Sequence, residues 1–445
     1  MTTSLLTDLY ELTMLEASLQ SGVSSRGSSF EVFTRSLPAG RRYGVVAGIA
    51  RVVEAISNFK FNEDDLEYLE TTKHLNKETL KYLSNFRFSG NIWSYEEGEA
   101  YFPYSPIMRV EAPFAEAILL ETIVLSILNF DSAVASAGAR MVSAAGTRRV
   151  VEMGSRRTHE YAAIAAARAA FIVGFAATSN LKAGQIYGIP TAGTVAHAFM
   201  MAHDDERAAF TAQILAQGPA TTVLVDTYNI ENAIKEVISI AGTSLGAIRI
   251  DSGDPAKESR TARALLDILG ATKTQIVISG DLDEFSINEL SHEPIDGFGV
   301  GTRLVTGSGA PTANFVYKIV AIDKGHGLEP VTKLSAAKVT LGGRKFPWRV
   351  LDSNGKAVME YLESIGSPET SVEIPELETK KLRPLQRQII RDGEPELKTQ
   401  LKDIRIFHQD SLNELDESAR DLASGQSSLD TVLRDSRGHL IKASN

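Results

Sequence analysis

Between residues 222 and 302 the chain contains four short apolar runs: Thr222-Val223-Leu224-Val225-Asp226, Ala247-Ile248-Arg249-Ile250-Asp251, Gln275-Ile276-Val277-Ile278-Ser279-Gly280-Asp281 and Gly297-Phe298-Gly299-Val300-Gly301-Thr302. Each of the first three is followed by a charged or glycine-rich turn and then by an amphipathic helical pattern. Short apolar runs flanked by helices are typical of strands that are buried on both faces of a parallel sheet. The stretch therefore predicts an α/β fold, and it directs attention to the carboxyl edge of the sheet, where such folds bind ligands.

Three further strand-like segments precede these runs, at residues 149–153, 173–176 and 189–191. Seven strands over about 150 residues are too few for a regular eight-stranded barrel. We therefore predict an irregular, incomplete (β/α) barrel.

The remaining sequence divides into three parts around this barrel. Residues 1–112 predict an α+β N-terminal domain, which precedes the catalytic barrel domain at residues 113–314. Residues 315–366 predict antiparallel strands that return to the N-terminal domain, and residues 367–445 are a C-terminal extension rich in proline and charge. Outside the barrel strands we expect helices at residues 7–19, 113–130, 132–144 and 410–422, and a helical pair at residues 62–85 that is interrupted near Thr71 and Thr72. The pattern at residues 29–34 alternates as in a half-buried strand, and further strands are expected at residues 315–321, 331–333 and 345–351.

Composition narrows the class of protein. The net charge of −10 gives no support to a nucleic-acid partner, which usually needs a concentrated basic face. The absence of cysteine excludes disulfides and cysteine-ligated zinc and fits a reducing compartment. The N-terminus lacks the basic and apolar regions of a signal peptide, and no apolar run approaches membrane-spanning length. We expect a soluble cytoplasmic enzyme with neither membrane nor nucleic-acid partners.

Polar residues follow every predicted barrel strand, and together they include two arginine positions, several carboxylates, one histidine and glycine turns. In chain order these clusters are Gly154-Ser155-Arg156-Arg157, Thr178-Ser179-Asn180, Gly193-Thr194-Val195-Ala196-His197, Asp226-Thr227, Arg249 to Asp254, Ser279-Gly280-Asp281 and Gly299-Val300-Gly301-Thr302. Arginines and exposed glycine amides bind phosphate or carboxylate, while carboxylates hold magnesium or sugar hydroxyls. The predicted edge therefore suits a phosphorylated sugar and a second anion.

Each element also has a simpler structural interpretation. Taken singly, Asp226, Asp251 and Asp281 fit N-caps of the following helices, and a pair such as Arg156-Arg157 is usually solvated. One histidine among eight is more often structural than catalytic. Arg249 is harder to explain in this way, because it interrupts an apolar run where an unpaired guanidinium would be costly to bury. The occurrence of polar residues at all seven strand ends favours a functional site.

At these residues the chain resembles nicotinate phosphoribosyltransferase, a type II phosphoribosyltransferase, over nearly its whole length. The matching motifs are residues 6–14 (LTDLYELTM), 30–35 (FEVFTR), 154–157 (GSRR), 193–197 (GTVAH), 248–254 (IRIDSGD), 278–281 (ISGD), 299–302 (GVGT), 333–335 (KLS) and 343–345 (GRK). Taken together, the order and spacing of these motifs are specific for that family, although no single motif is decisive.

The resemblance implies that nicotinate and phosphoribosyl pyrophosphate form nicotinate mononucleotide and pyrophosphate, in NAD salvage, with coupled hydrolysis of ATP. It also implies that ATP transiently phosphorylates His197, which explains why the sequence contains no P-loop motif. Phosphorylation there would place new negative charge beside the pyrophosphate site. Magnesium is the implied metal, and zinc is not expected.

The resemblance also assigns roles to individual residues. His197, Asp251 and Arg249 are the catalytic candidates, and Asp251 and Asp254 would hold magnesium or ribose hydroxyls. Tyr10 would stack on the pyridine ring from the partner subunit of a homodimer with shared active sites. The substrate-binding candidates are Tyr10, Arg156, Arg157, Ser179, Thr194, Asp226, Asp254, Ser279, Gly280, Gly299, Gly301 and Thr302.

Two alternatives stay open at this stage. The substrate could instead be nicotinamide or quinolinate, although quinolinate needs more basic residues and its chemistry does not need ATP. The chain could also be an inactive barrel that binds a nucleotide as a regulator. The presence of His197, Asp251 and Asp254 together weighs against that reading, because binding alone does not require all three.

Overall fold

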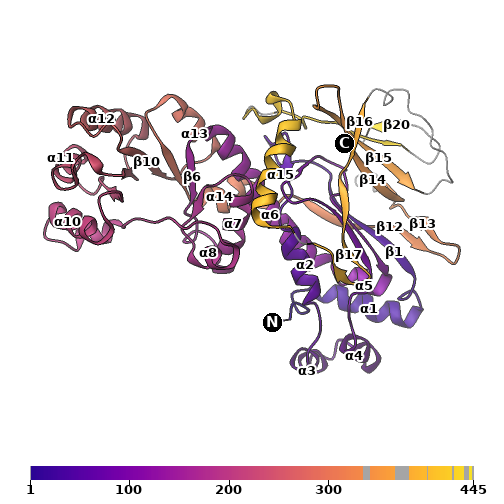
Figure 1. Ribbon diagram of the computed structural model, residues 1–445. Coiled ribbons are helices and arrows are strands. Elements are labelled where there is room, and N and C mark those ends of the chain that lie inside the picture. The colour runs from indigo at the N-terminus through magenta and orange to yellow at the C-terminus, as the bar shows by residue number, and fades with distance from the viewer. Residues whose placement is uncertain are drawn as a thin grey trace. The chain divides into compact units, whose positions relative to one another are not determined.

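The computed structural model describes residues 2–333, 341–365, 380–397, 399–422, 425–434 and 440–442. The chain forms two compact units, Met1–Ser136 with Thr312–Asn445, and Ala137–Pro311 (Figure 1). The sequence-based division at residues 112 and 314 differs from this one mainly because a long helix continues from the first unit into the second. Ser335 and residues 366–379 lie outside the described residues.

The first unit is built on an antiparallel sheet that takes strands from both ends of the chain. Its central strand β1 (Gly27–Thr34) pairs with β5 (Met108–Pro113) on one side and with β12 (Phe315–Asp323) on the other. The strands after the barrel therefore complete the N-terminal sheet, as predicted. The other strands of this unit's first two sheets are β2 (Gly44–Val45), β3 (Asn91–Tyr95), β4 (Ala100–Tyr101), β13 (Leu328–Pro330), β17 (Gln386–Arg391) and β18 (Glu394–Pro395).

Two sequence expectations for these strands were wrong. The pattern at residues 29–34 predicted a half-buried strand, but every residue of β1 after Gly27 is buried. Side chains therefore cover both faces of the sheet at this strand. The strand expected at residues 331–333 lies slightly earlier, as β13, where it pairs with the end of β12.

Helices of the first unit are α1 (Leu9–Ser21), α2 (Ile49–Ser57), α3 (Glu63–Thr72), α4 (Lys77–Ser84) and α5 (Phe114–Ile118). The helical pair predicted at residues 62–85 is confirmed, including its interruption near residue 72. Asparagines start both members: the side chain of Asn62 accepts from the N–H of Asp65, and that of Asn76 from the N–H of Thr79.

The predicted break between two helices at residue 131 was wrong, because α6 runs unbroken over Glu121–Ala145. Asp131 and Ser132 make tertiary contacts and do not cap a helix. Asp131 Oδ1 lies 2.5 Å from Nη1 of Arg51, and Ser132 Oγ accepts from the N–H of Ala47 at 3.0 Å. As one helix, α6 is long and apolar enough to cross a membrane, but 72% of its most apolar window is buried, as in the core helix of a globular protein.

A further sheet of the first unit belongs to the C-terminal part of the chain. It consists of β14 (Arg344–Leu351), β15 (Ala357–Ile365), β16 (Lys381–Pro384), β19 (Thr431–Arg434) and β20 (Leu440–Lys442). The helix expected at residues 410–422 begins earlier, as α15 (Leu401–Glu414), and a 3-10 turn follows at Glu417–Arg420.

Buried ion pairs connect these C-terminal elements to the N-terminal sheet. The Arg349 side chain is fully buried and donates to Glu360 at 2.8 Å. Arg383 bridges Glu99, at 2.7 Å, and Glu414 of α15, at 2.5 Å. Breaking one partner of a buried pair leaves an uncompensated charge, so this network helps to fix where the C-terminal extension lies.

The second unit is an open parallel sheet with strand order β7-β6-β11-β10-β9-β8. Its strands are β6 (Arg149–Glu152), β7 (Ala177–Thr178), β8 (Thr222–Leu224), β9 (Ala247–Ile250), β10 (Gln275–Gly280) and β11 (Gly297–Val300). Because β7 and β8 lie at opposite edges and do not pair, the barrel is incomplete, as predicted.

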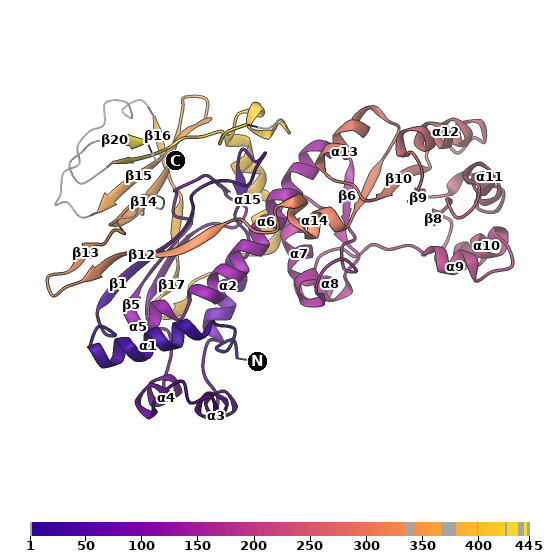
Figure 2. The same cartoon turned by 180° about the vertical axis from the view of Figure 1, so that it is seen from behind.

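Helices connect the strands of this sheet, and Figure 2 shows α10, α11 and α12 side by side along β8, β9 and β10. The helices are α7 (Glu160–Ile172), α8 (Leu181–Tyr187), α9 (His197–Met201), α10 (Glu206–Gln217), α11 (Ile230–Ala241), α12 (Pro255–Ile268), α13 (Glu284–Glu289) and α14 (Thr302–Val305). Two of the predicted strands were wrong: one lies later in the chain, and the other is a single bridge. Residues 173–176 form a turn at Gly174 before β7, and of residues 189–191 only Thr191 forms a bridge, to Thr178.

His408 supplies a test of how α15 packs within the first unit. Its buried Nδ1 lies 2.8 Å from the carbonyl oxygen of Gly98, and burial lowers the pKa of His408 from 6.5 to about 4. At a pH between these two pKa values, His408 is protonated in the unfolded chain but neutral in the folded chain. The free energy of unfolding should therefore fall by about 3 kcal/mol as the pH falls from 6.5 to 4.

Chemical denaturation across this pH range checks the prediction by comparing the wild type with His408→Gln, whose amide can still donate to Gly98. The variant should lose stability less steeply with acid. Equal slopes for the two proteins would contradict a buried neutral His408.

Candidate active site

The second unit brings the predicted polar residues to the carboxyl edge of its parallel sheet. They lie at the ends of β6 to β11 and in the segment that leads into α9. Tyr10 is the exception, since it lies on α1 of the first unit, where it is 44% exposed.

His197 and Asp226 form the pair with the most direct chemical meaning. Nε2 of His197 lies 3.1 Å from Oδ1 of Asp226. The Asp226 side chain is 1% exposed, whereas that of His197 is 37% exposed. The carboxylate therefore holds the ring from the protein side and leaves the rest of the imidazole accessible.

Asp226 also organises the neighbouring strand end. Its Oδ2 accepts from the backbone N–H of Asp251 at 2.9 Å and from Oγ of Ser252 at 2.7 Å. The simpler interpretation of Asp226 as an N-cap is excluded, because Asn229 caps the following helix, α11. Both oxygens of one buried carboxylate thus fix the ends of β8 and β9 and the start of α9.

Arg249 points its guanidinium toward the same region. Its Nη1 donates to Oγ1 of Thr194 at 3.3 Å, while its buried Nε has no hydrogen-bond partner within the described residues. Burial lowers the pKa of Arg249, and the carboxylates of Asp251 and Asp226 oppose that shift. A guanidinium remains charged near neutral pH, so unused donors remain for an anionic ligand.

The three other aspartates at this edge differ in what they bind. Asp254 is an N-cap, since its Oδ1 accepts from the N–H groups of Ala256 and Lys257 at the start of α12. Asp251 is not a cap, because Asp254 already caps α12. The Oδ1 of Asp251 instead accepts from Oγ of Ser279. Asp281 is not one either, since Asp283 caps α13. Asp281 accepts from Thr302 at 3.4 Å, and this contact connects the ends of β10 and β11.

Glycines allow the turns to approach one another closely. A Cβ on Gly154 would come within 2.3 Å of Cγ1 of Val305 and 3.2 Å of the carbonyl oxygen of Gly301. A Cβ on Gly299 would lie 2.8 Å from Sδ of Met153. At Gly280 the backbone has a φ of +135°, which glycine adopts most readily.

The exposed residues of the two turns beside β6 complete the edge. Arg156 and Arg157 are exposed, and the turn is closed by the N–H of Arg157, which donates to the carbonyl of Gly154 at 2.8 Å. Ser179 is also exposed, next to Asn180, whose side-chain amide donates to Oγ of Ser155 at 3.0 Å. The two arginines therefore have their guanidinium groups toward solvent.

One buried residue of this edge was missed by the sequence analysis. Glu152 ends β6 and is fully buried, and it accepts from the hydroxyl of Thr178 and from the N–H of Gly154. The signal was present, since Glu152 interrupts an apolar run in the way that drew attention to Arg249.

Metal binding would have to rely on few protein ligands. Within the described residues no group of three or more histidine or acidic side chains is placed to hold a metal ion. Asp251 and Asp254 are exposed at the end of β9. One or two carboxylates together with substrate phosphates are the usual ligands of Mg²⁺, so this donor set fits that ion.

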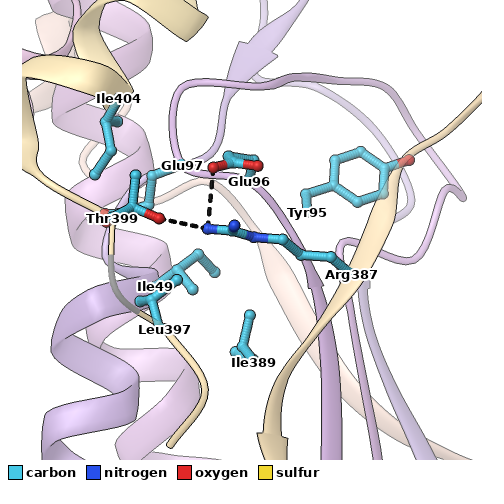
Figure 3. Close-up of a pocket in the computed structure, with 9 residues that line it drawn as sticks. All are labelled: Ile49, Tyr95, Glu96, Glu97, Arg387, Ile389, Leu397, Thr399 and Ile404. Carbon is cyan, nitrogen blue, oxygen red and sulfur yellow. Dashed lines mark hydrogen bonds and ion pairs between the residues drawn. The ribbon is translucent and has the colours of Figure 1, made fainter.

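A small cavity lies elsewhere, within the first unit (Figure 3). Arg387 crosses it and contacts Glu96 at 3.0 Å and Thr399 at 2.6 Å. Its space of about 10 Å³ holds no more than one water molecule. It is too small for a substrate.

Comparison with known proteins places this fold and its polar edge among the phosphoribosyltransferases. Models of the nicotinate phosphoribosyltransferase family match the chain, the N-terminal domain at residues 5–129 and the main family region at residues 148–345. The chain belongs to the nicotinate phosphoribosyltransferase family.

Individual relatives agree with this assignment. The chain is 52% identical to nicotinate phosphoribosyltransferase pncB1 of Mycobacterium tuberculosis, over 96% of this chain and 94% of that protein. It is 39% identical to nicotinate phosphoribosyltransferase of Bacillus subtilis, over 81% and 76%. The crystal structure of human nicotinic acid phosphoribosyltransferase superposes with a TM-score of 0.80 at 26% identity, covering 97% of this chain and 98% of that one.

The close approach at Gly154 gives a prediction. In Gly154→Ala the new methyl group would overlap Val305, and relieving such overpacking typically costs about 1–3 kcal/mol. Thermal unfolding should show this loss. Gly193→Ala is the matched control, because no atom lies within 4 Å of the added Cβ. Equal melting temperatures for the two variants would contradict the packing described here.

Proposed function

We propose that this protein transfers the phosphoribosyl group of phosphoribosyl pyrophosphate to nicotinate, giving nicotinate mononucleotide and pyrophosphate in NAD salvage. ATP hydrolysis is coupled to the transfer through a transient phosphohistidine at His197. The observation that carries the proposal is the accessible His197 ring held by the buried Asp226, at the same sheet edge as Arg249.

The His197–Asp226 contact supports a specific course for phosphorylation. A carboxylate only accepts hydrogen bonds, so Nε2 of His197 carries the hydrogen and Nδ1 keeps its lone pair. Nδ1 then attacks the γ-phosphorus of ATP, the bond to the β–γ bridging oxygen breaks, and ADP leaves. Asp226 stabilises the positive charge that develops on the ring. Water later cleaves the N–P bond and releases phosphate.

Anion binding falls to the local positive groups, because the net charge of −10 repels anionic substrates at a distance. Arg156, Arg157 and Arg249 bind the nicotinate carboxylate and the phosphoribosyl phosphates. The backbone N–H groups of Gly280 and Gly301 bind the 5′-phosphate. Further polar contacts come from neighbouring turns and strand ends, at Ser179, Thr194, Ser279, Gly299 and Thr302.

Transfer proceeds through an oxocarbenium-like transition state at the anomeric carbon. The protein contributes mainly by positioning the two substrates and by its electrostatic field. Asp251 and Asp254 hold ribose hydroxyls or Mg²⁺. When bound, Mg²⁺ neutralises charge on the pyrophosphate group and so makes it a better leaving group.

We also propose that two copies of the chain share their active sites, with Tyr10 stacking on the pyridine ring in the partner's site. Large apolar side chains are exposed along the N-terminal segment and α1, and an interface would bury them. These side chains are Leu5, Leu6, Leu9, Tyr10 and Met14. A cytoplasmic location fits the absence of cysteine, and the proposed reaction involves neither membrane nor nucleic acid.

The proposed activity is tested by incubating purified protein with nicotinate, phosphoribosyl pyrophosphate, Mg²⁺ and ATP. We expect stoichiometric nicotinate mononucleotide and pyrophosphate, and faster formation with ATP than without it. Nicotinamide and quinolinate, tested separately and as competitors, should react poorly. Efficient turnover of either one instead of nicotinate would refute the assigned substrate.

The role of His197 is tested by His197→Ala. Because this variant lacks the phosphate acceptor, it should lose acid-labile labelling from γ-³²P-ATP together with the stimulation of turnover by ATP, while a slow ATP-independent reaction remains. Asp226→Asn should reduce labelling at least tenfold, on the scale of a lost acid–base or charge-stabilising group. The control is His292→Ala, an exposed histidine that precedes β11. Undiminished ATP stimulation in His197→Ala would exclude the phosphohistidine.

A further inference from the structure

We propose that Glu152 is a positioning residue, which holds the turn that carries Arg156 and Arg157 in register with the turn that carries Ser179. This inference deepens the proposed function and rests on it, because it concerns how the anion-binding arginines are placed. Glu152 touches neither substrate nor reacting atoms in this scheme.

The carboxylate joins two turns directly. Glu152 is the last residue of β6, and its Oε1 accepts from the N–H of Gly154, at the start of the arginine turn. Its Oε2 accepts from the hydroxyl of Thr178, the last residue of β7. The carbonyl oxygen of Glu152 accepts from the N–H of Ser179 at 2.8 Å. One residue therefore contacts both turns through its side chain and its backbone.

Additional hydrogen bonds close this arrangement into a ring. Thr178 Oγ1 accepts from the N–H of Asn180 at 2.9 Å, and the Asn180 side chain donates to Oγ of Ser155 at 3.0 Å. Ser155 lies between Gly154 and the arginines. A displacement of either turn would therefore break several hydrogen bonds at once.

The same ring reaches the segment that leads to His197. The N–H of Thr178 donates to the carbonyl of Pro190 at 3.0 Å, and its carbonyl accepts from the N–H of Ala192 at 2.9 Å. Thr194, the partner of Arg249, follows two residues later. Thr178 thus contacts both Glu152 and the segment that leads to His197.

A purely structural role would not explain why a carboxylate stands here. Burial raises the pKa of Glu152, and hydrogen bonds from Thr178 and Gly154 oppose that shift. Within the described residues no charged group acts on the Glu152 carboxylate, and burying an unpaired carboxylate is costly. An acidic group beside an anion-binding turn does not attract the substrate either. Its benefit is geometric, since two acceptor oxygens orient two donors from different turns.

The decisive experiment compares Glu152→Ala with Glu152→Gln. The alanine variant loses both acceptors, whereas glutamine can accept from Gly154 with its oxygen and donate to Thr178 Oγ1 with its amide. We expect Glu152→Ala to raise the KM for nicotinate or phosphoribosyl pyrophosphate by about tenfold or more, with a smaller change in kcat. Glu152→Gln should restore KM to within about threefold of the wild type, because its geometry is nearly preserved.

A matched pair of threonine variants separates positioning from stability. Thr178→Val removes the hydroxyl that bonds to Glu152. Thr274→Val removes an equally buried hydroxyl at the amino end of β10, where it donates to the carbonyl of Leu245 at 3.0 Å. Both should lose stability, but only Thr178→Val should raise KM. Unchanged KM values in both Glu152→Ala and Thr178→Val would overturn the proposal.

Hydrogen–deuterium exchange tests the geometry without turnover. Amides of residues 154–157 and 179–180 should exchange faster in Glu152→Ala than in the wild type, and should be unaffected in Thr274→Val. Unchanged exchange there would overturn the positioning role, even if activity falls. A wild-type protein that forms no mononucleotide would instead refute the proposed function, and the exchange comparison would still decide the role of Glu152.

Discussion

Buried carboxylates at the ends of parallel strands constrain the whole candidate site. A carboxylate out of contact with water needs hydrogen-bond donors for both of its oxygens. Asp226 takes its donors from His197, Asp251 and Ser252, and Glu152 takes its donors from Gly154 and Thr178. Each carboxylate therefore forces loops that are distant in sequence to meet. The sheet brings the strand ends to one edge, and these two groups set the finer geometry between them.

Buried charge has a different consequence in the first unit. Arg349 and Arg383 are paired with Glu360, Glu99 and Glu414, so positive and negative groups compensate each other within the protein. Asp226 and Arg249, by contrast, are bonded in part to polar groups that face the sheet edge. The first arrangement fixes the C-terminal elements, whereas the second leaves donors and a histidine ring that a ligand can use.

The sequence predicted the architecture well because a short run of apolar, β-branched residues is a local pattern that by itself indicates a buried strand. It failed where tertiary contacts replaced local ones. A break between two helices was predicted at residue 131, yet α6 is continuous there and Arg51 pairs with Asp131 in the middle of the helix. The interpretation of Asp226 as a possible cap failed for the same reason, since no sequence pattern reveals that His197 lies opposite. Glu152 was detectable as a charge within an apolar run, but its two partners are set by how β6 and β7 pair.

In the proposed function, the arrangement of charge at the edge lets an acidic protein bind anions. A net charge of −10 acts over long distances and is screened by salt, while hydrogen bonds from a guanidinium act at contact distance. The carboxylate of Asp226 is directed inward, toward backbone and side-chain donors, so little of its charge faces the ligand. Arg156 and Arg157 instead face solvent. The exposed part of the edge therefore carries Arg156 and Arg157 together with Asp251 and Asp254, while the buried acids Asp226 and Glu152 act as internal supports. In the proposed function, the support given by Glu152 matters because flexible arginine side chains bind an anion well only when their backbone is held in place.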